Sequence, residues 1–303
     1  MMSRPSYLEA LDSGALAHQT RAARDALGQC RLCPRSCRVD RLNNETGICK
    51  TGRRAVVASV HPHFGEEPEL VGVHGSGTIF FTHCSLGCRF CQNADISHEG
   101  TGQAVEDDVL AAMMLELQSL GCHNINFVTP SHVVPQILAA VLIAAEKGLR
   151  IPLVYNSSGY DSVATLALMD GVIDIYMPDF KFWDAAIAAA TCDAPDYPET
   201  ARLAIREMHR QVGQLQTDAR GIARRGMIIR HLVLPEDLAG TAAITRFIAS
   251  ELTADSYVNI MPQYRPCAEV ATHPALNRRL KPSEFASAVT AARKAGLTRL
   301  SGF

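Results

Sequence analysis

Three closely spaced cysteines are the residues of this 303-residue chain that point most directly to chemistry. They are Cys84, Cys88 and Cys91, in the run Cys-Ser-Leu-Gly-Cys-Arg-Phe-Cys. Thiolates are the usual ligands of iron–sulfur clusters, and a 4Fe–4S cubane has four irons to be ligated. Three sulfurs in one loop therefore leave one iron open to a substrate or cofactor, as catalytic metal sites keep a free position. A zinc knuckle or three buried thiols is the alternative.

A second set of cysteines lies nearer the N-terminus and has four thiols. Cys30, Cys33 and Cys37 fall within eight residues, and Cys49 follows. Four thiolates suit a closed tetrahedral Zn²⁺ site or a second 4Fe–4S cluster. The spacing does not distinguish these two, and four unligated thiols are a third reading. Clustered cysteines without a secretory signal indicate ligation in a reducing cytoplasm rather than disulfides.

The first run also has an aromatic residue, Phe90, directly before its last cysteine, which gives the pattern CxxxCxΦC. This pattern resembles the signature of radical S-adenosylmethionine (SAM) enzymes. The loop Gly87 to Asn93 and the later strand ends resemble the pyruvate formate-lyase activating enzymes. The branch with an N-terminal CxxCPRxC element is more similar still, because Cys30 to Cys37 match that element. The resemblance covers nearly the whole chain.

The resemblance assigns SAM binding to polar residues at the ends of the predicted strands. Asp179 and Lys181 match the family's Asp-x-Lys motif, and their opposite charges suit the zwitterionic end of SAM. Arg230 matches an arginine that approaches SAM, whereas the adjacent His231 faces the other side of its strand and is expected in the core. The complete expected set is Phe90, Asn93, Thr129, Asn156, Ser157, Ser158, Asp179, Lys181, Arg230 and Tyr264.

The chain departs from the family pattern at three of these positions. Thr129 begins the segment where family members have Gly-Gly-Glu, so its carbonyl or its neighbours would contact the SAM amino group. An ordinary turn with Ser131 as helix N-cap is the alternative. Asn156 stands in place of an aspartate, which weakens the expectation of a monovalent cation beside SAM. Tyr264 stands in place of a histidine and is expected to stack on adenine.

The resemblance implies radical chemistry. A reduced 4Fe–4S cluster would cleave SAM to a 5′-deoxyadenosyl radical that takes a hydrogen atom from a substrate. A flavodoxin- or ferredoxin-type electron donor is implied as a partner. The leading substrate is a glycyl radical enzyme, and another protein, a peptide or a small molecule is the second reading. A non-catalytic iron–sulfur redox or sensor protein is the third, and no catalytic residue is assigned.

Short apolar segments alternate with helical patterns from residue 78 onward, which predicts parallel strands joined by right-handed crossovers. The expected fold is α/β, a partial (β/α)6 barrel of the radical SAM type, with an open doubly wound sheet as the alternative. Both folds bind ligands at the carboxyl ends of their strands, where Cys84 follows the first one. The predicted strands are 78–83, 124–129, 151–155, 172–177, 227–234 and 257–261.

Helices are predicted on apolar periodicity and flanking glycines. Residues 1–76 are expected to hold an N-terminal helix and the four-cysteine element, and residues 77–303 the partial barrel. The acidic segment 66–68 is expected to be a solvated loop, with a place at the substrate mouth as the alternative. The predicted helices are 7–27, 110–117, 161–169, 197–215, 235–250 and 283–294.

The amino-acid composition favours some classes of protein and excludes others. The chain is 47% hydrophobic and 20% charged, which is typical of a globular protein with a large core. Its net charge of −2 gives no electrostatic footprint for nucleic acid. The apolar run 137–145 is too short to span a bilayer. The sequence therefore predicts a cytoplasmic enzyme that binds neither nucleic acid nor a membrane.

Overall fold

The computed structural model describes residues 4–267 and 274–302 of the chain. In these ranges one sheet has the strand order β10-β9-β8-β6-β5-β4-β2-β1-β3, and β7 pairs with β8 beside it. The strands are β1 (Ala55–His63), β2 (Ser76–Phe81), β3 (Gln103–Val105), β4 (Ile125–Val128), β5 (Leu153–Ser157), β6 (Ile175–Pro178), β7 (Gln216–Thr217), β8 (Ala223–Leu232), β9 (Tyr257–Met261) and β10 (Arg299–Ser301).

The run from β2 to β10 consists of parallel strands that follow one another in chain order, apart from β3, which pairs with β1 at the edge of the sheet, and the short β7, which lies beside β8. A doubly wound sheet reverses its strand order at a switch point, and this run has no reversal. The order also ends at β3 and β10 without closing into a full barrel. The predicted partial barrel is therefore confirmed, and the doubly wound alternative is excluded.

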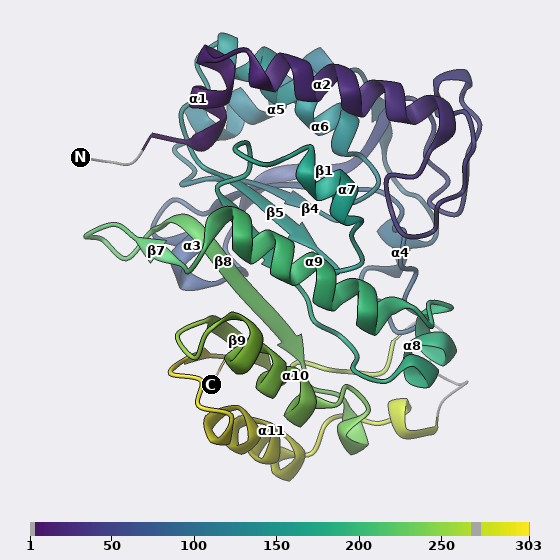
Figure 1. Cartoon of the computed structure of the whole chain (residues 1–303), viewed down its shortest axis with the longest axis vertical. Helices are drawn as coiled ribbons and strands as arrows, with labels where there is room; N and C mark the ends of the chain where they lie inside the picture. Colours follow the sequence, from purple (N-terminus) through teal and green to yellow (C-terminus); the bar gives the residue numbers. More distant parts are fainter. Residues whose placement is uncertain (1–3, 268–273, 303) are drawn as a thin grey trace.

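Helices cover the outer side of the curved sheet, and Figure 1 shows α1, α2, α5 and α6 gathered at one end and α10 and α11 at the other. Helix α6 is buried along most of its length because it lies against both α2 and α5. The helices are α1 (Ser6–Asp12), α2 (Ala15–Asp25), α3 (Pro68–Val71), α4 (Ala94–Ser97), α5 (Asp107–Ser119), α6 (Val134–Glu146), α7 (Val163–Ala167), α8 (Ala185–Cys192), α9 (Tyr197–Val212), α10 (Thr241–Phe247) and α11 (Pro282–Lys294).

Two predicted helices are wrong in their continuity. The segment 7–27 forms two helices, because Gly14 has a left-handed φ of 78° that ends one and starts the next. The segment 235–250 begins as a short 3-10 turn, and only then does α10 start, after Gly240 with φ of 74°. The predicted strand 257–261 has the bounds of β9, and the other five strands are present with shifted ends.

The region before residue 76 contributes a strand that the sequence pattern did not predict. Strand β1 pairs antiparallel with β2 and with β3, so part of this region extends the same sheet. Helices α1 and α2 pack on α6 from outside. The cysteine segment between α2 and β1 thereby lies close to the barrel. None of the described helices combines the length and apolar composition needed to cross a membrane.

Candidate functional site

The three-cysteine loop lies between β2 and α4, at the carboxyl end of β2. Cys84, Cys88 and Cys91 line one cavity of about 160 Å³. The Ser97 hydroxyl at the end of α4 donates a hydrogen bond of 3.1 Å to Cys91 Sγ. A donor at a cluster sulfur tunes the cluster's reduction potential. The loop thus presents three soft ligands and a polar partner to one hollow.

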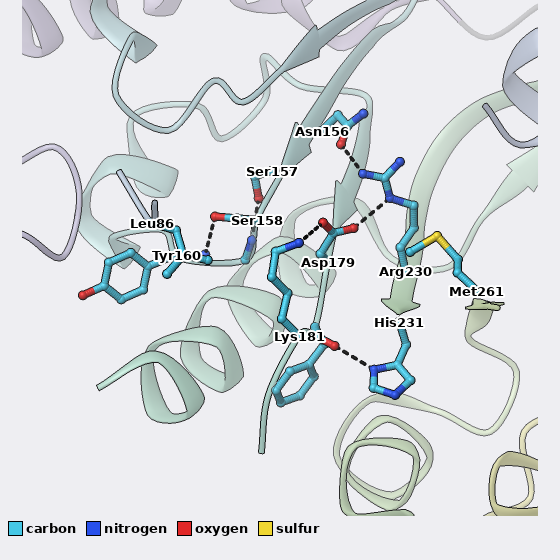
Figure 2. Close-up of polar contacts among 12 residues, drawn as sticks. Leu86, Asn156, Ser157, Ser158, Tyr160, Asp179, Lys181, Arg230, His231 and Met261 are labelled. Atoms are coloured by element: carbon cyan, nitrogen blue, oxygen red, sulfur yellow. Dashed lines mark hydrogen bonds and ion pairs between the residues drawn. The ribbon is translucent and has the colours of Figure 1, made fainter. Parts of the chain in front are cut away.

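Polar residues from four neighbouring parallel strands line the same cavity. Their side chains come together because the carboxyl ends of parallel strands meet at one edge of the sheet. Figure 2 shows those from β5, β6 and β8 converging. The predicted residues in this lining, besides the cysteines, are Asn93, Thr129, Asn156, Ser157, Ser158, Asp179, Lys181 and Arg230.

A buried charge network forms the floor of this cavity. The Asp179 carboxylate accepts from Lys181 Nζ at 2.5 Å and from Arg230 Nε at 2.9 Å, as Figure 2 shows. Arg230 Nη2 donates to Asn156 Oδ1 at 2.6 Å. Burial alone would raise the pKa of Asp179, but the charges of Arg230 and Lys181 bring it below its ordinary value. The network therefore keeps opposite charges ionised side by side.

Glu66 is a member of this network that was not predicted among the SAM contacts, since its segment was expected to be a solvated loop or, alternatively, to lie at the substrate mouth. Its carboxylate lies 3.2 Å from Arg230 Nη1 and accepts weakly from Asn156 Nδ2 at 3.4 Å. The side chain is only 9% exposed, so the prediction of a solvated loop is wrong at this residue. Burial raises the pKa of Glu66 above its ordinary value, against the opposing effect of Arg230. No local pattern signals this role, because the segment before α3 reaches the site only through the tertiary fold.

Two predicted SAM contacts, Phe90 in the loop itself and Tyr264, do not line the cavity just described. The Phe90 ring packs against the rings of Phe182 and Tyr264, at centroid distances of 5.9 and 6.1 Å. Tyr264 is 3% exposed, and its hydroxyl donates to the Leu276 carbonyl at 2.6 Å. The structure does not bring Tyr264 to this cavity. Its ring and that of Phe90 support the cysteine loop from the core.

His231 faces away from the network, as its position next to Arg230 on β8 requires. Its Nδ1 lies 2.8 Å from the Phe180 carbonyl oxygen and its Nε2 lies 2.9 Å from Thr241 Oγ1. Burial lowers the pKa of His231. The prediction that this histidine belongs to the core is confirmed.

Thr129 has an unusual backbone for its residue type. It follows β4 directly, lines the cavity, and has a φ of 60°, in the left-handed region. A branched side chain rarely adopts this conformation. The Thr129 amide donates to the Asn156 carbonyl at 2.9 Å, which ties the end of β4 to β5. Strained backbone of this kind is concentrated at functional sites.

The four N-terminal cysteines surround a much smaller hollow. Cys30, Cys33, Cys37 and Cys49 line a cavity of about 10 Å³ together with Arg41. Burial, aided by the neighbouring thiols, raises the pKa of Cys33 to about 12. Thiols must lose their protons to bind a metal, so binding here would release protons. Among the described residues, no group of three or more His, Cys, Asp or Glu side chains is arranged to hold a metal ion.

Arg41 is a buried cation beside these thiols. It is 1% exposed, and its Nη1 donates to the His132 carbonyl at 2.7 Å and lies 3.8 Å from Cys30 Sγ. Its Nη2 has no hydrogen-bond partner, and no carboxylate among the described residues pairs with it. A buried charge without a counter-charge is costly. Thiolates gathered on a metal centre would supply that negative charge, so the residue types present suit such a centre, while the side chains of the described residues are not arranged around a metal ion.

Comparison with known proteins places the chain in a family. No protein-family model matches it. An uncharacterised protein of Methanocaldococcus jannaschii is 30% identical over 297 residues, which is 96% of this chain and 82% of that protein. Among solved structures, a radical SAM methyltransferase from Sphaerobacter thermophilus superposes with a TM-score of 0.51 at 15% identity, over 75% of this chain and 66% of that one. Methylornithine synthase gives a TM-score of 0.42 at 12% identity, over 74% and 70%. The chain therefore belongs to the family of the Methanocaldococcus jannaschii protein, and its fold is that of the radical SAM enzymes.

Proposed function

We propose that this protein is a radical SAM enzyme. The observation that carries the proposal is that the three cysteines of one loop and the polar ends of β4, β5, β6 and β8 line a single cavity. A non-catalytic iron–sulfur protein would not need a polar binding surface facing its cluster loop. Cys84, Cys88 and Cys91 would hold a 4Fe–4S cluster. When bound, this cluster and SAM together supply a 5′-deoxyadenosyl radical that removes a hydrogen atom from a substrate.

The charge network is suited to the methionine end of SAM. Asp179 and Glu66 provide two negative charges, and Lys181 and Arg230 provide two positive ones. A zwitterion can enter such a balanced set, because its carboxylate replaces a partner of the cations and its ammonium replaces a partner of the carboxylates. At the end of β5, the Ser158 hydroxyl would meet ribose oxygens, whereas the Ser157 hydroxyl donates to Asp161 at 2.6 Å and would act mainly by holding this strand end in place.

We place the substrate in the hollows beside this site. A cavity of about 270 Å³ shares Arg230 and the cysteine loop with the SAM cavity. A larger one, of about 780 Å³, shares Arg230 as well and extends along β9 and β10. Glu67 lines it, is 4% exposed, and has one carboxylate oxygen without a hydrogen-bond partner in the described structure. An acidic lining of this kind favours a substrate that brings hydrogen-bond donors.

The finer proposal is that the substrate is a glycyl radical enzyme, which rests on the likeness to the activating enzymes. The unclosed sheet supports it, because an open barrel edge leaves room for a loop of a partner protein. The N-terminal cysteines would hold Zn²⁺ or a second cluster, and a flavodoxin- or ferredoxin-type protein would deliver the electron. An EPR signal of a glycyl radical, formed on a glycyl radical enzyme from the same organism, would support this substrate. Product formation without such a signal would favour another protein, a peptide or a small molecule.

The central proposal is tested by anaerobic reconstitution with iron and sulfide, followed by SAM and dithionite. We expect 5′-deoxyadenosine and methionine from the wild-type protein, measured by liquid chromatography. A variant in which Cys84, Cys88 and Cys91 are all alanine should form neither product. Failure of a wild-type protein with an intact cluster to form 5′-deoxyadenosine would refute the proposal.

A further inference from the structure

Arg35 connects the two cysteine regions. It lies between Cys33 and Cys37 in the N-terminal element, and its side chain leaves that element toward the barrel. The Nε donates to the Ser85 carbonyl at 2.9 Å, and Nη2 donates to the Leu86 carbonyl at 3.1 Å. Both carbonyls belong to the stretch between Cys84 and Cys88. One side chain of the first cysteine region therefore holds the backbone of the second.

The same guanidinium also binds the end of α8. Nη2 donates to the Cys192 carbonyl at 2.8 Å, and Nη1 donates to the Asp193 carbonyl. The last carbonyls of a helix have no partner within the helix and need donors from elsewhere. The neighbouring Thr191 carbonyl accepts from the Arg89 amide at 2.9 Å, so the cysteine loop is attached to the same helix end. Arg35 thus completes a junction of the loop, the helix and the N-terminal element.

The ring of Tyr160 forms the remaining side of this junction. The Arg35 guanidinium carbon lies 5.4 Å from its ring centre, within the range of a cation–π contact. Tyr160 follows the end of β5, next to the proposed ribose contacts. Its hydroxyl donates to Asp196 at 2.8 Å, which fixes the ring. Arg35 therefore contacts both the cysteine loop and the segment after the SAM-binding strand.

We propose that Arg35 is a positioning residue that holds the three-cysteine loop in its cluster-binding conformation from the N-terminal cysteine element. The rigid fork of a guanidinium can reach four carbonyls in different directions, whereas the ammonium of lysine is a single point with three donors. A positive charge at position 35 without the guanidinium geometry would therefore not hold all four carbonyls. The inference rests on the proposed function only for the identity of the cluster, because the contacts belong to the chain itself.

The test compares Arg35→Lys and Arg35→Ala with Arg31→Ala in the full-length protein. Arg31 is the matched control, because it lies in the same element, is exposed, and within the described part of the chain its side chain makes a single hydrogen bond, to Gln29 Oε1 at 3.4 Å. Hydrogen exchange of the amides of residues 84–91, measured before any iron is added, reports the loop alone. We expect exchange to rise at least about tenfold in both Arg35 variants and to stay unchanged in Arg31→Ala.

A second readout separates positioning from a general loss of stability. After reconstitution and reduction, the clusters that the Arg35→Lys variant still binds should give an EPR line shape that differs from wild type and responds less to SAM. A weaker signal of unchanged shape and unchanged SAM response would overturn the inference. So would wild-type exchange in residues 84–91 of both Arg35 variants. Neither measurement requires turnover, so a wild-type protein that makes no 5′-deoxyadenosine would refute the proposed function without deciding this one.

Discussion

The two cysteine regions of this protein use the same ligand type in opposite ways. In the N-terminal element, four thiols enclose a hollow of about 10 Å³. In the loop after β2, three thiols form only part of the wall of a hollow of about 160 Å³, and polar strand ends form the rest. A closed donor set is typical of a structural centre, and an incomplete one is typical of a centre that binds a ligand. The difference lies in what surrounds the sulfurs.

The charged residues around the two cysteine regions also distinguish a structural centre from one that binds a ligand. Arg41 stands beside the N-terminal thiols without a carboxylate partner among the described residues. Beside the loop, Arg230 and Lys181 are each paired with a carboxylate, and under the proposed function a zwitterionic ligand would exchange with those pairs. A lone buried cation requires a permanent negative centre, whereas a balanced network tolerates a ligand that comes and goes. The first region is therefore expected to be structural and the second to be the working site.

The largest expected effect separates the metal content of the two regions. Cys88→Ala should abolish iron binding at the loop and leave the N-terminal metal in place, because the two donor sets share no residue. Iron, zinc and acid-labile sulfide per chain, measured after anaerobic reconstitution, would show this. Cys122→Ala is the control, because Cys122 is a buried thiol outside both cavities.

That variant also identifies the N-terminal metal. Zinc without labile sulfide would make the element a structural zinc site, and iron with sulfide would make it a second cluster. Unchanged iron in Cys88→Ala, relative to wild type, would contradict the assignment of the loop ligands.

The next largest effect is expected in the charge network. Asp179→Asn removes the carboxylate that pairs with both Lys181 and Arg230. Removing one partner of a buried charge pair costs about 2–5 kcal/mol, so SAM affinity should fall by roughly 30-fold or more. Calorimetric titration of SAM into the reconstituted protein measures it. Glu199→Gln is the control, because its ion pair with Arg202 is at the surface. Equal affinities would remove Asp179 from the SAM site.

A smaller effect is expected at the N-terminal element. Arg41→Gln keeps hydrogen-bond donors but removes the buried charge, so metal affinity there should fall by roughly tenfold, in line with other residues that contact metal ligands. Competition with a chelator measures it. Arg53→Gln, which changes an arginine in an exposed pair with Glu106, should have no effect. Unchanged chelator resistance in Arg41→Gln would show that the element does not need this cation.

The smallest effect concerns pH. Burial raises the pKa of Glu66, so this carboxyl takes up its proton at a higher pH than an ordinary glutamate. Its contact with Arg230 is present above that pKa and weakens as the pH falls through it. SAM affinity of the wild type should therefore decline on mild acidification, and Glu66→Gln should have the lower affinity already and lack that step. Parallel pH profiles for the two proteins would contradict the role of Glu66.

The parts of the molecule that local sequence determines were predicted well. The buried strands are continuous apolar runs, and their order along the chain follows from the alternation with helices. The cysteine loop and the residues Asn156, Asp179, Lys181 and Arg230 could be placed because each lies at a strand end, and all of them line the cavity. A ligand site at the carboxyl edge of a parallel sheet is a property of the fold. The cysteine motif and the strand topology therefore point to the same edge.

The parts that depend on tertiary contacts were not predictable. Strand β1 contains Pro62 and two histidines and is only half-buried, so it lacks the apolar pattern of an inner strand. Glu66 joins the network across 164 positions of sequence, and no spacing rule connects it to Arg230. Tyr264 was predicted to contact adenine because it follows a strand end. In the structure its hydroxyl instead donates to the Leu276 carbonyl inside the core.

Thr129 adds a conformational cost to the folded chain at the end of β4. A branched residue held at positive φ raises the energy of the folded chain by about 1–3 kcal/mol. Glycine would adopt the same backbone without strain and would also leave the peptide free to turn. A change to glycine that makes the folded chain more stable to heat would therefore also leave the direction of the carbonyl at position 129 less fixed. Selection for thermal tolerance alone would favour glycine at this position and loosen the end of β4.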